Sequence, residues 1–149
     1  MNPEAFMHLA IEEARKSQTP FGAVIVQEGE VIEQAGNTVH TDQDPVCHAE
    51  VNAIRQLAKR FGNAAPSGSY TLYSTCEPCA MCAATCLWAG IQHIVYGVGS
   101  ADFADGNPNM IDIPCEEVFQ RSPKQYTIEN GLLRDACKQL HQEFPLEDL

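Results

Sequence analysis

Two short segments, His48–Ala49–Glu50 and Pro78–Cys79–Ala80–Met81–Cys82, constrain the fold of this chain more than any other feature. Between them they supply one imidazole, two thiols and one carboxylate, the kinds of side chain that bind Zn²⁺ in proteins. A structural zinc normally has four protein ligands, whereas a catalytic zinc has three and keeps one position open. One His and two Cys therefore predict a catalytic zinc, and the fold must bring the two segments to one point.

Glu50 is the carboxylate that such a site leaves available for proton transfer. Zinc held by one imidazole and two thiolates lowers the pKa of its bound water towards neutrality, which produces a nucleophile for an electron-poor carbon. A carboxylate in this role takes up a proton and returns it to a leaving nitrogen, contributing about 10²- to 10⁴-fold to the rate. The pattern His-x-Glu followed by Pro-Cys-x-x-Cys is the signature of zinc nucleobase deaminases. Hydrolytic loss of ammonia from an amino-substituted ring is the expected reaction.

Strands and helices are expected to alternate after an initial hairpin, which predicts a single three-layer α/β/α domain over residues 1–149 with a partly parallel sheet. Both ligand segments are expected at helix N-termini, where unpaired N–H groups favour anionic ligands. Apolar periodicity predicts helices near 2–17, 48–62, 78–88, 115–120 and 132–144. The expected strands are 21–26 and 31–32, both well buried, then 70–74, 91–98 and 126–128, with loops at 37–46 and 101–114.

The composition restricts the substrate and the compartment. The 149 residues carry a formal net charge of −11, with nine Lys and Arg against twenty Asp and Glu. Nucleic-acid binding draws much of its affinity from basic side chains that neutralise phosphates, so a small neutral substrate is favoured over a nucleic acid. The seven cysteines do not form a secreted disulfide framework and fit a reducing cytoplasm. No apolar run approaches the roughly 20 residues needed to span a bilayer, so no membrane association is expected.

Beyond the signature, the chain resembles the cytidine deaminase-like superfamily, and within it the branch of guanine deaminases and tRNA adenosine deaminases. The resemblance extends from Pro20 to about Gly99. It rests on the segments Pro20–Phe21–Gly22–Ala23–Val24–Ile25–Val26, Asn37, Asp44–Pro45, His48–Ala49–Glu50–Val51 and Ser74–Thr75–Cys76–Glu77–Pro78–Cys79–Ala80–Met81–Cys82. It implies a mixed five-stranded sheet, zinc as the cofactor and a homodimer.

The resemblance also implies roles for individual residues. His48, Cys79 and Cys82 would bind the zinc, and Glu50 would be the proton shuttle. The substrate would contact Asn37, Phe21, Ala49 and Trp88. Phe21, Cys76 and Trp88 resemble guanine deaminases more than tRNA adenosine deaminases. The loop 101–112 matches the guanine deaminase pattern only loosely, and the C-terminal residues 145–149 do not match it. The expected substrate is therefore a small-molecule purine base or nucleoside, with guanine to xanthine as the leading reaction.

Other functions stay open. A tRNA adenosine deaminase would need a basic path for the anticodon backbone, and a deaminase of cytosine or another small heterocycle would use the same centre. Cys76, Cys79, Cys82 and Cys86 also have the spacing of bacterial ferredoxin ligands, with Leu87 where that motif has Pro. A zinc module without catalysis is a further alternative. Cys47, Cys115 and Cys137 are expected to be structural, and His8, His40, His93 and His141 to be surface or core residues.

Overall fold

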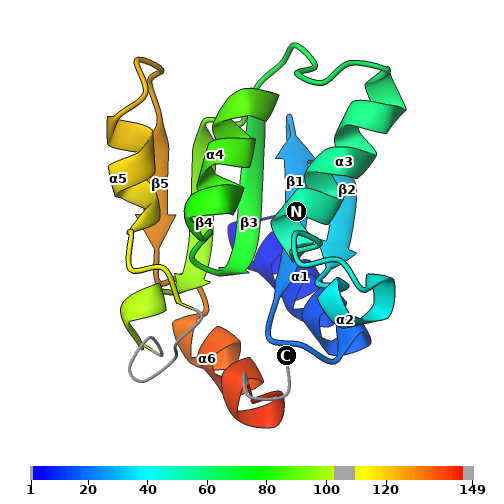
Figure 1. Ribbon diagram of the computed structural model, residues 1–149, viewed down its shortest axis with the longest axis vertical. Helices are drawn as coiled ribbons and strands as arrows, with labels where there is room; N and C mark the ends of the chain where they lie inside the picture. Colours follow the sequence, from blue (N-terminus) through cyan, green and yellow to red (C-terminus); the bar gives the residue numbers. More distant parts are fainter. Residues whose placement is uncertain (1, 103–109, 146–149) are drawn as a thin grey trace.

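The computed structural model describes residues 2–102 and 110–145. A five-stranded sheet in the order β2-β1-β3-β4-β5 forms the middle layer (Figure 1). β1 (Gly22–Gln27) is antiparallel to both of its neighbours, β2 (Glu30–Gly36) and β3 (Tyr70–Cys76). β4 (His93–Val98) and β5 (Thr127–Asn130) extend the sheet parallel to β3. The sheet is therefore mixed, as the family resemblance implied.

Helices cover both faces of the sheet. α1 (Pro3–Ser17) and α6 (Arg134–Glu143) lie on one face, and α3 (Ala49–Phe61), α4 (Ala80–Ala89) and α5 (Cys115–Gln120) lie on the other (Figure 1). Successive strand residues point to opposite faces, so Val24 belongs to the core under α1 and Ile25 to the core under α3. The predicted three-layer α/β/α sandwich is confirmed.

Gly22 permits the close approach of α1 to the sheet. A Cβ at this position would lie 1.9 Å from the Ala10 carbonyl oxygen and 2.7 Å from the Ala14 nitrogen. The Gly22 N–H donates to Thr75 Oγ1 (3.1 Å), and this hydroxyl donates to the Pro20 carbonyl (2.8 Å). The residues before β1 are thereby fixed beside the end of β3.

Two expectations about the first half of the chain need correction. β1 is buried as predicted, but β2 is an edge strand in which only Ala35 is fully buried, because it has a neighbour on one side alone. The segment 37–46 is not only loop, since it contains the single helical turn α2 (Val39–Asp42). Both features depend on pairing and packing that a local pattern does not encode.

The second half follows its predicted order. α5, β5 and α6 occupy the predicted segments, and β5 is an edge strand. The short 3₁₀ helix η1 (Ser100–Asp102) opens the segment 101–114. Residues 103–109 of the predicted loop lie outside the described residues. No helix in the described ranges is long and apolar enough to cross a bilayer.

One edge of the sheet gathers the predicted site residues. β3 and β4 are parallel and end together, with Cys76 opposite Val98. The antiparallel β1 starts at this edge and β2 ends there, with Gly22 opposite Gly36. The segments that carry Phe21, Asn37 and Cys79 therefore leave the sheet on the same side, at the carboxyl ends where ligands bind in open α/β sheets.

Candidate metal centre

The imidazole of His48 and the thiols of Cys79 and Cys82 form one cluster. Their ligand atoms all lie within 4.8 Å of one another, with His48 Nδ1 3.6 Å from Cys79 Sγ and 3.5 Å from Cys82 Sγ. A tetrahedral zinc with Zn–S of about 2.3 Å and Zn–N of about 2.0–2.1 Å holds nitrogen and sulfur about 3.6 Å apart. The spacing therefore fits a tetrahedral ion with three protein ligands.

The local backbone presents two of these ligands at helix starts. His48 is the N-cap of α3 and Cys79 is the N-cap of α4, both with extended backbone angles. Neither side chain caps its own helix, so the imidazole and the thiol are turned to the cluster instead. Cys82 follows within the first turn of α4 and is fully buried. Pro78 stands directly before the N-cap, so it lies outside the helix, two residues before the first helical position Ala80, and not in the first turn as predicted.

The electrostatics of the two thiols are opposite. The pKa of Cys79 is lowered to about 4, chiefly because its thiolate accepts from the Cys82 thiol and also faces His48. The pKa of Cys82 is raised, because its ionisation would break that bond and place a second charge in a buried position. The pKa of His48 is raised by its contact with Cys79. The opposite shifts favour the thiolate form at Cys79 and the protonated form at Cys82, and a metal that binds both sulfurs must displace the Cys82 proton.

Glu50 lies beside this cluster and is not a member of it. The side chain is 6% exposed, and burial raises its pKa to about 7, while Cys82 and His48 act in the other direction. A carboxyl group with a pKa near neutrality can both accept and donate a proton at working pH. A proton shuttle needs a carboxyl group of this kind, and the role of Glu50 stays a prediction.

Three of the four predicted substrate contacts lie at the end of the sheet that carries the metal cluster, where β3 and β4 finish. Ala49 is the buried first residue of α3. The Asn37 N–H donates to the Phe21 carbonyl (3.2 Å), and Asn37 Oδ1 accepts from the Val39 N–H (3.0 Å). The Phe21 ring is partly buried and meets the His141 ring edge-on at 5.7 Å.

Trp88 is the exception. It is 77% exposed and lies nine residues beyond the N-cap Cys79, which places it about 14 Å along the helix axis at 1.5 Å per residue. Within a single chain the structure does not bring Trp88 to the metal cluster, so its contact with the substrate stays a prediction. The periodicity of α4 directs its cysteines inwards and this indole outwards.

The other cysteines are buried and outside the ligand cluster. Cys47, Cys76, Cys86, Cys115 and Cys137 are all buried free thiols. A ferredoxin-type site would unite Cys76 and Cys86 with Cys79 and Cys82, whereas the observed cluster has His48 in their place. This donor set, one nitrogen and two sulfurs, favours zinc over an iron–sulfur cluster.

Two supporting residues escaped the sequence analysis. Asn52 Nδ2 donates to the Gly36 carbonyl (2.9 Å), to Thr38 Oγ1 (2.9 Å) and to the Cys47 carbonyl (3.3 Å), so it connects the Asn37 segment to the residue before His48. The Glu77 carboxylate accepts hydrogen bonds from Ser100 and Cys115. The position of Glu77 directly before Pro78–Cys79 was a signal in the sequence that it supports the ligand segment. No such signal existed for Asn52, because its hydrogen-bond partners are distant in sequence.

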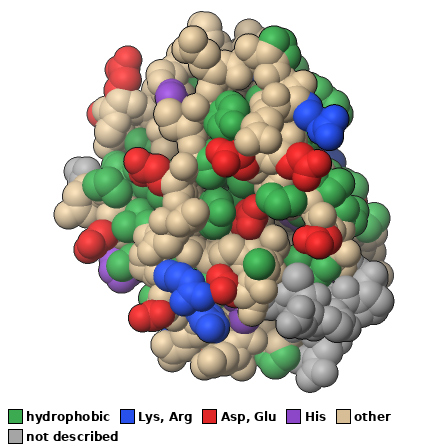
Figure 2. All heavy atoms as spheres, turned by 90° about the vertical axis from the view of Figure 1, so that its left-hand side faces the viewer, with side chains coloured by type: hydrophobic (Ala, Val, Ile, Leu, Met, Phe, Trp, Pro, Cys, Tyr) green, Lys and Arg blue, Asp and Glu red, His purple; other side chains and the backbone are tan. Residues whose placement is uncertain are grey.

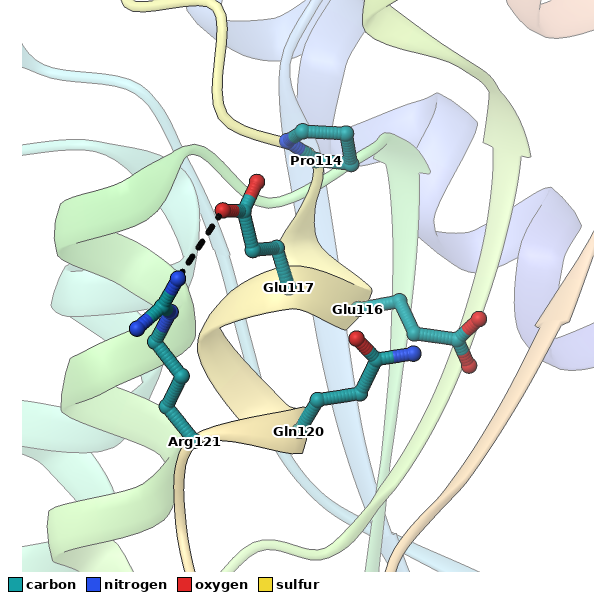
Figure 3. Close-up of a pocket in the computed structure, with 5 residues that line it drawn as sticks. All are labelled: Pro114, Glu116, Glu117, Gln120 and Arg121. Carbon is teal, nitrogen blue, oxygen red and sulfur yellow. Dashed lines mark ion pairs between the residues drawn. The ribbon is translucent and has the colours of Figure 1, made fainter.

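A separate surface pocket lies on α5. Its volume is about 450 Å³, and it is lined by Pro114, Glu116, Glu117, Gln120 and Arg121. Figure 3 shows Glu117 directed to Arg121, with which it forms an ion pair, while Glu116 and Gln120 extend to the other side. None of the metal ligands lines this pocket, so it is distinct from the candidate centre.

A family model agrees with this geometry. The model of the cytidine and deoxycytidylate deaminase zinc-binding region matches residues 1–98, which include the ligands and Glu50. The chain belongs to this deaminase family. Zinc is accordingly the cofactor of this deaminase, and the His48–Cys79–Cys82 cluster is the group that could hold it.

Relatives of this deaminase have two different activities. Guanine deaminase of Bacillus subtilis is 38% identical over 128 residues, covering 78% of this chain and 81% of its own length. The tRNA-specific adenosine deaminase of the same organism is 34% identical over 139 residues, covering 90% of this chain and 83% of its own.

Solved structures show the same division. A structure from a study of tRNA:A34 deaminases has a TM-score of 0.76 and 31% identity, covering 91% of this chain and 98% of its own. Guanine deaminase from Nitrosomonas europaea has a TM-score of 0.81 and 25% identity, covering 95% and 84%. The family is therefore established, and both activities occur among the relatives of this deaminase.

Proposed function

We propose that this chain hydrolyses the amino group of a small purine, with guanine as the preferred base, to give xanthine and ammonia. The observation that carries the proposal is the buried Glu50 carboxyl beside a cluster of three metal ligands. Zinc, when bound, supplies a Lewis acid that activates water for attack on an electron-poor ring carbon.

The residues of the chain have distinct parts in this reaction. Glu50 takes up one proton from the attacking water and delivers it to a ring nitrogen. It then takes the remaining proton from the new hydroxyl on the ring carbon and passes it to the amino group, so the C–N bond breaks, ammonia leaves neutral and the carbon keeps a carbonyl oxygen. The amide nitrogen of Asn37 is the donor left for a substrate oxygen or ring nitrogen, because Oδ1 is used by Val39. Phe21 offers an aromatic ring against which a purine can pack.

The basic side chains support a small substrate over tRNA. Five of the nine, Arg15, Lys16, Arg60, Arg121 and Arg134, are already in ion pairs with acidic residues. Two others are also engaged, since Lys124 Nζ donates to the Leu87 carbonyl and Arg55 contacts Cys47 Sγ. Figure 2 shows acidic side chains spread among apolar ones on the face turned to the viewer, with no continuous basic stripe among the coloured residues. Phosphate binding would have to compete with these partners.

Ammonia release from a panel of substrates tests the proposal. The zinc-loaded chain is assayed on guanine, guanosine, adenine, adenosine, cytosine and a tRNA anticodon stem-loop. Guanine should react fastest, and Glu50→Gln should lower kcat by about 10²- to 10⁴-fold with its zinc content unchanged. Release from no member of the panel would refute the enzyme assignment.

Deamination of tRNA adenosine is the second candidate, favoured by the similarity to tRNA-specific adenosine deaminases over 90% of this chain. The two candidates differ in their salt dependence. Activity on tRNA should fall steeply between about 50 and 200 mM salt through loss of phosphate contacts, whereas activity on a neutral base should change little. Activity confined to the stem-loop would replace guanine by tRNA as the substrate.

A further inference from the structure

A single carboxylate connects the ligand turn to two segments that are distant in sequence. Glu77 Oε1 accepts from the Ser100 N–H (3.0 Å) and from Ser100 Oγ (3.1 Å). Its other oxygen, Oε2, accepts from the Cys115 N–H (2.8 Å). Ser100 begins η1 at the end of β4, and Cys115 is the buried first residue of α5. Glu77 therefore holds both described ends of the connection between β4 and α5.

The segment around Ser100 is also held by contacts of Asp102, one of them with α6. Asp102 Oδ2 accepts from the Gly99 N–H (3.2 Å), and Asp102 Oδ1 pairs with Arg134 Nη2 of α6 (2.6 Å). The Cys115 side has α5 packed against α4, the helix that carries two of the metal ligands. Both described ends of the connection are thus positioned at the edge of the sheet where the metal centre lies.

The metal ligands do not depend on the Glu77 side chain. The Glu77 N–H donates to the Val98 carbonyl (2.8 Å), and the Cys79 carbonyl accepts from the Ala83 N–H (2.8 Å). These backbone bonds fix the turn through Pro78 whether or not the carboxylate is present. Removal of the carboxylate therefore releases Ser100 and Cys115 while leaving the Cys79 thiol in place.

We infer that Glu77 is a positioning residue that holds residues 99–102 and 110–115 beside the bound purine, so that it sets substrate affinity and not zinc affinity. The inference rests on the proposed function. A substrate at the open zinc position must lie next to Cys79, two residues from Glu77, and the held segments border that edge of the sheet. If these two segments were not held by Glu77, they would bind the purine less well, while the reacting groups would be unchanged.

The two oxygens of Glu77 make the substitution Glu77→Gln informative. A carboxamide keeps one acceptor oxygen but presents an NH₂ group to the other N–H donor. Glu77→Gln therefore preserves the bonds to Ser100 or the bond to Cys115, but not both, whereas Glu77→Ala loses all three. The matched control is Glu116→Gln, which removes the same charge from an exposed neighbour of Cys115 without breaking a bond to the connection.

Steady-state kinetics on the best substrate, zinc content and amide hydrogen exchange test the inference together. Glu77→Gln should raise KM by about tenfold, as expected for a charge-assisted hydrogen bond, while kcat stays within about threefold. Zinc should remain at one ion per chain. Exchange should accelerate at Ser100 and Cys115 and stay unchanged in α4. The Ser100→Ala variant should give a smaller rise in KM that is not additive with that of Glu77→Gln.

Loss of zinc from Glu77→Gln, a fall in kcat at constant KM, or the same kinetic change in Glu116→Gln would each overturn the inference. If the wild-type chain deaminates nothing in the panel, the proposed function fails, and with it the role in substrate binding. Amide exchange then still decides whether Glu77 holds the two segments, and unchanged exchange in Glu77→Gln would reject that as well.

Discussion

Individual side chains around the candidate substrate edge have pKa values that differ from those in water. Burial lowers the pKa of His141 to about 4 from the usual 6.5, so the ring is neutral in the folded chain at neutral pH. Its partner Phe21 lies at the candidate substrate edge. The ionisation of one ring on α6 is thereby coupled to the packing of that edge.

His141 should make the fold sensitive to mild acid. The unfolded chain takes up a proton at this residue below pH 6.5, whereas the folded chain does so only near pH 4. The contribution to stability is thus complete above pH 6.5 and is lost as the pH falls towards 4. The loss should reach about 1 kcal/mol at pH 5, once the partial exposure of the ring is allowed for.

Urea unfolding of the wild type and His141→Gln between pH 7.5 and pH 5 measures this effect. The difference in free energy of unfolding between the two proteins should shrink as the pH falls, because the variant lacks the titrating group. Parallel curves over this range would contradict the prediction. Zinc release at low pH affects both proteins and cancels in the comparison.

Among the elements, α3 has the additional task of aligning two segments of the site. Asn52, one turn after His48, donates to acceptors at Gly36, Thr38 and Cys47. All three acceptors are oxygens, so the side chain must be a donor. This amide therefore fixes the relative positions of three segments: the end of β2, the Asn37 segment and the start of α3.

Asn52→Asp should therefore be strongly destabilising despite its unchanged shape. The substitution replaces the NH₂ donor by a carboxylate oxygen that faces three other oxygens, and we expect a loss of about 3 kcal/mol in the free energy of unfolding together with weaker zinc binding. Chemical denaturation and zinc titration with a competing chelator would measure the two effects. Asn63→Asp is the control, since Asn63 uses its oxygen as an acceptor from the Ala65 N–H, which a carboxylate preserves. Equal stability of the two variants would refute the role of Asn52.

The elements also show what a sequence can and cannot predict. The starts of α1, α3 and α4 follow from local signals, such as the Asn2 cap and the spacing of the ligands, and these were predicted closely. The exposure of β2 was mispredicted and that of Trp88 was not predicted, because exposure depends on which neighbours the folded chain supplies. The supporting roles of Glu77 and Asn52 could not be predicted from the sequence for the same reason, because only the folded sheet brings their hydrogen-bond partners together.

For the whole molecule, zinc should act as a link between the first and second halves of the sandwich. His48 comes from α3, which packs on β1 and β2, and the two cysteines come from α4, which packs beside α3 and α5. An ion held by all three stabilises the folded chain but not the unfolded one. At about 1,000 times the dissociation constant the gain is about 4 kcal/mol.

Removal of zinc with a chelator should consequently lower the Tm, and restoring one equivalent should return it. Differential scanning calorimetry of the two forms measures the shift. His48→Ala should have the Tm of the zinc-free protein whether or not zinc is added. An identical Tm with and without zinc in the wild type would exclude this linking role.

The antiparallel pairing of β1 with β3 also places the metal ligands at one end of the sheet and the turn between β1 and β2 at the opposite end. Gln27 lies opposite Tyr70 at the start of β3, whereas the metal ligands follow Cys76 at its finish. The exposed turn at Glu28 and Gly29 is therefore a full strand length from the reacting groups. Exposed turns of this kind tolerate inserted sequence, so a peptide tag or a surface tether introduced here would immobilise the protein with its centre facing the solution.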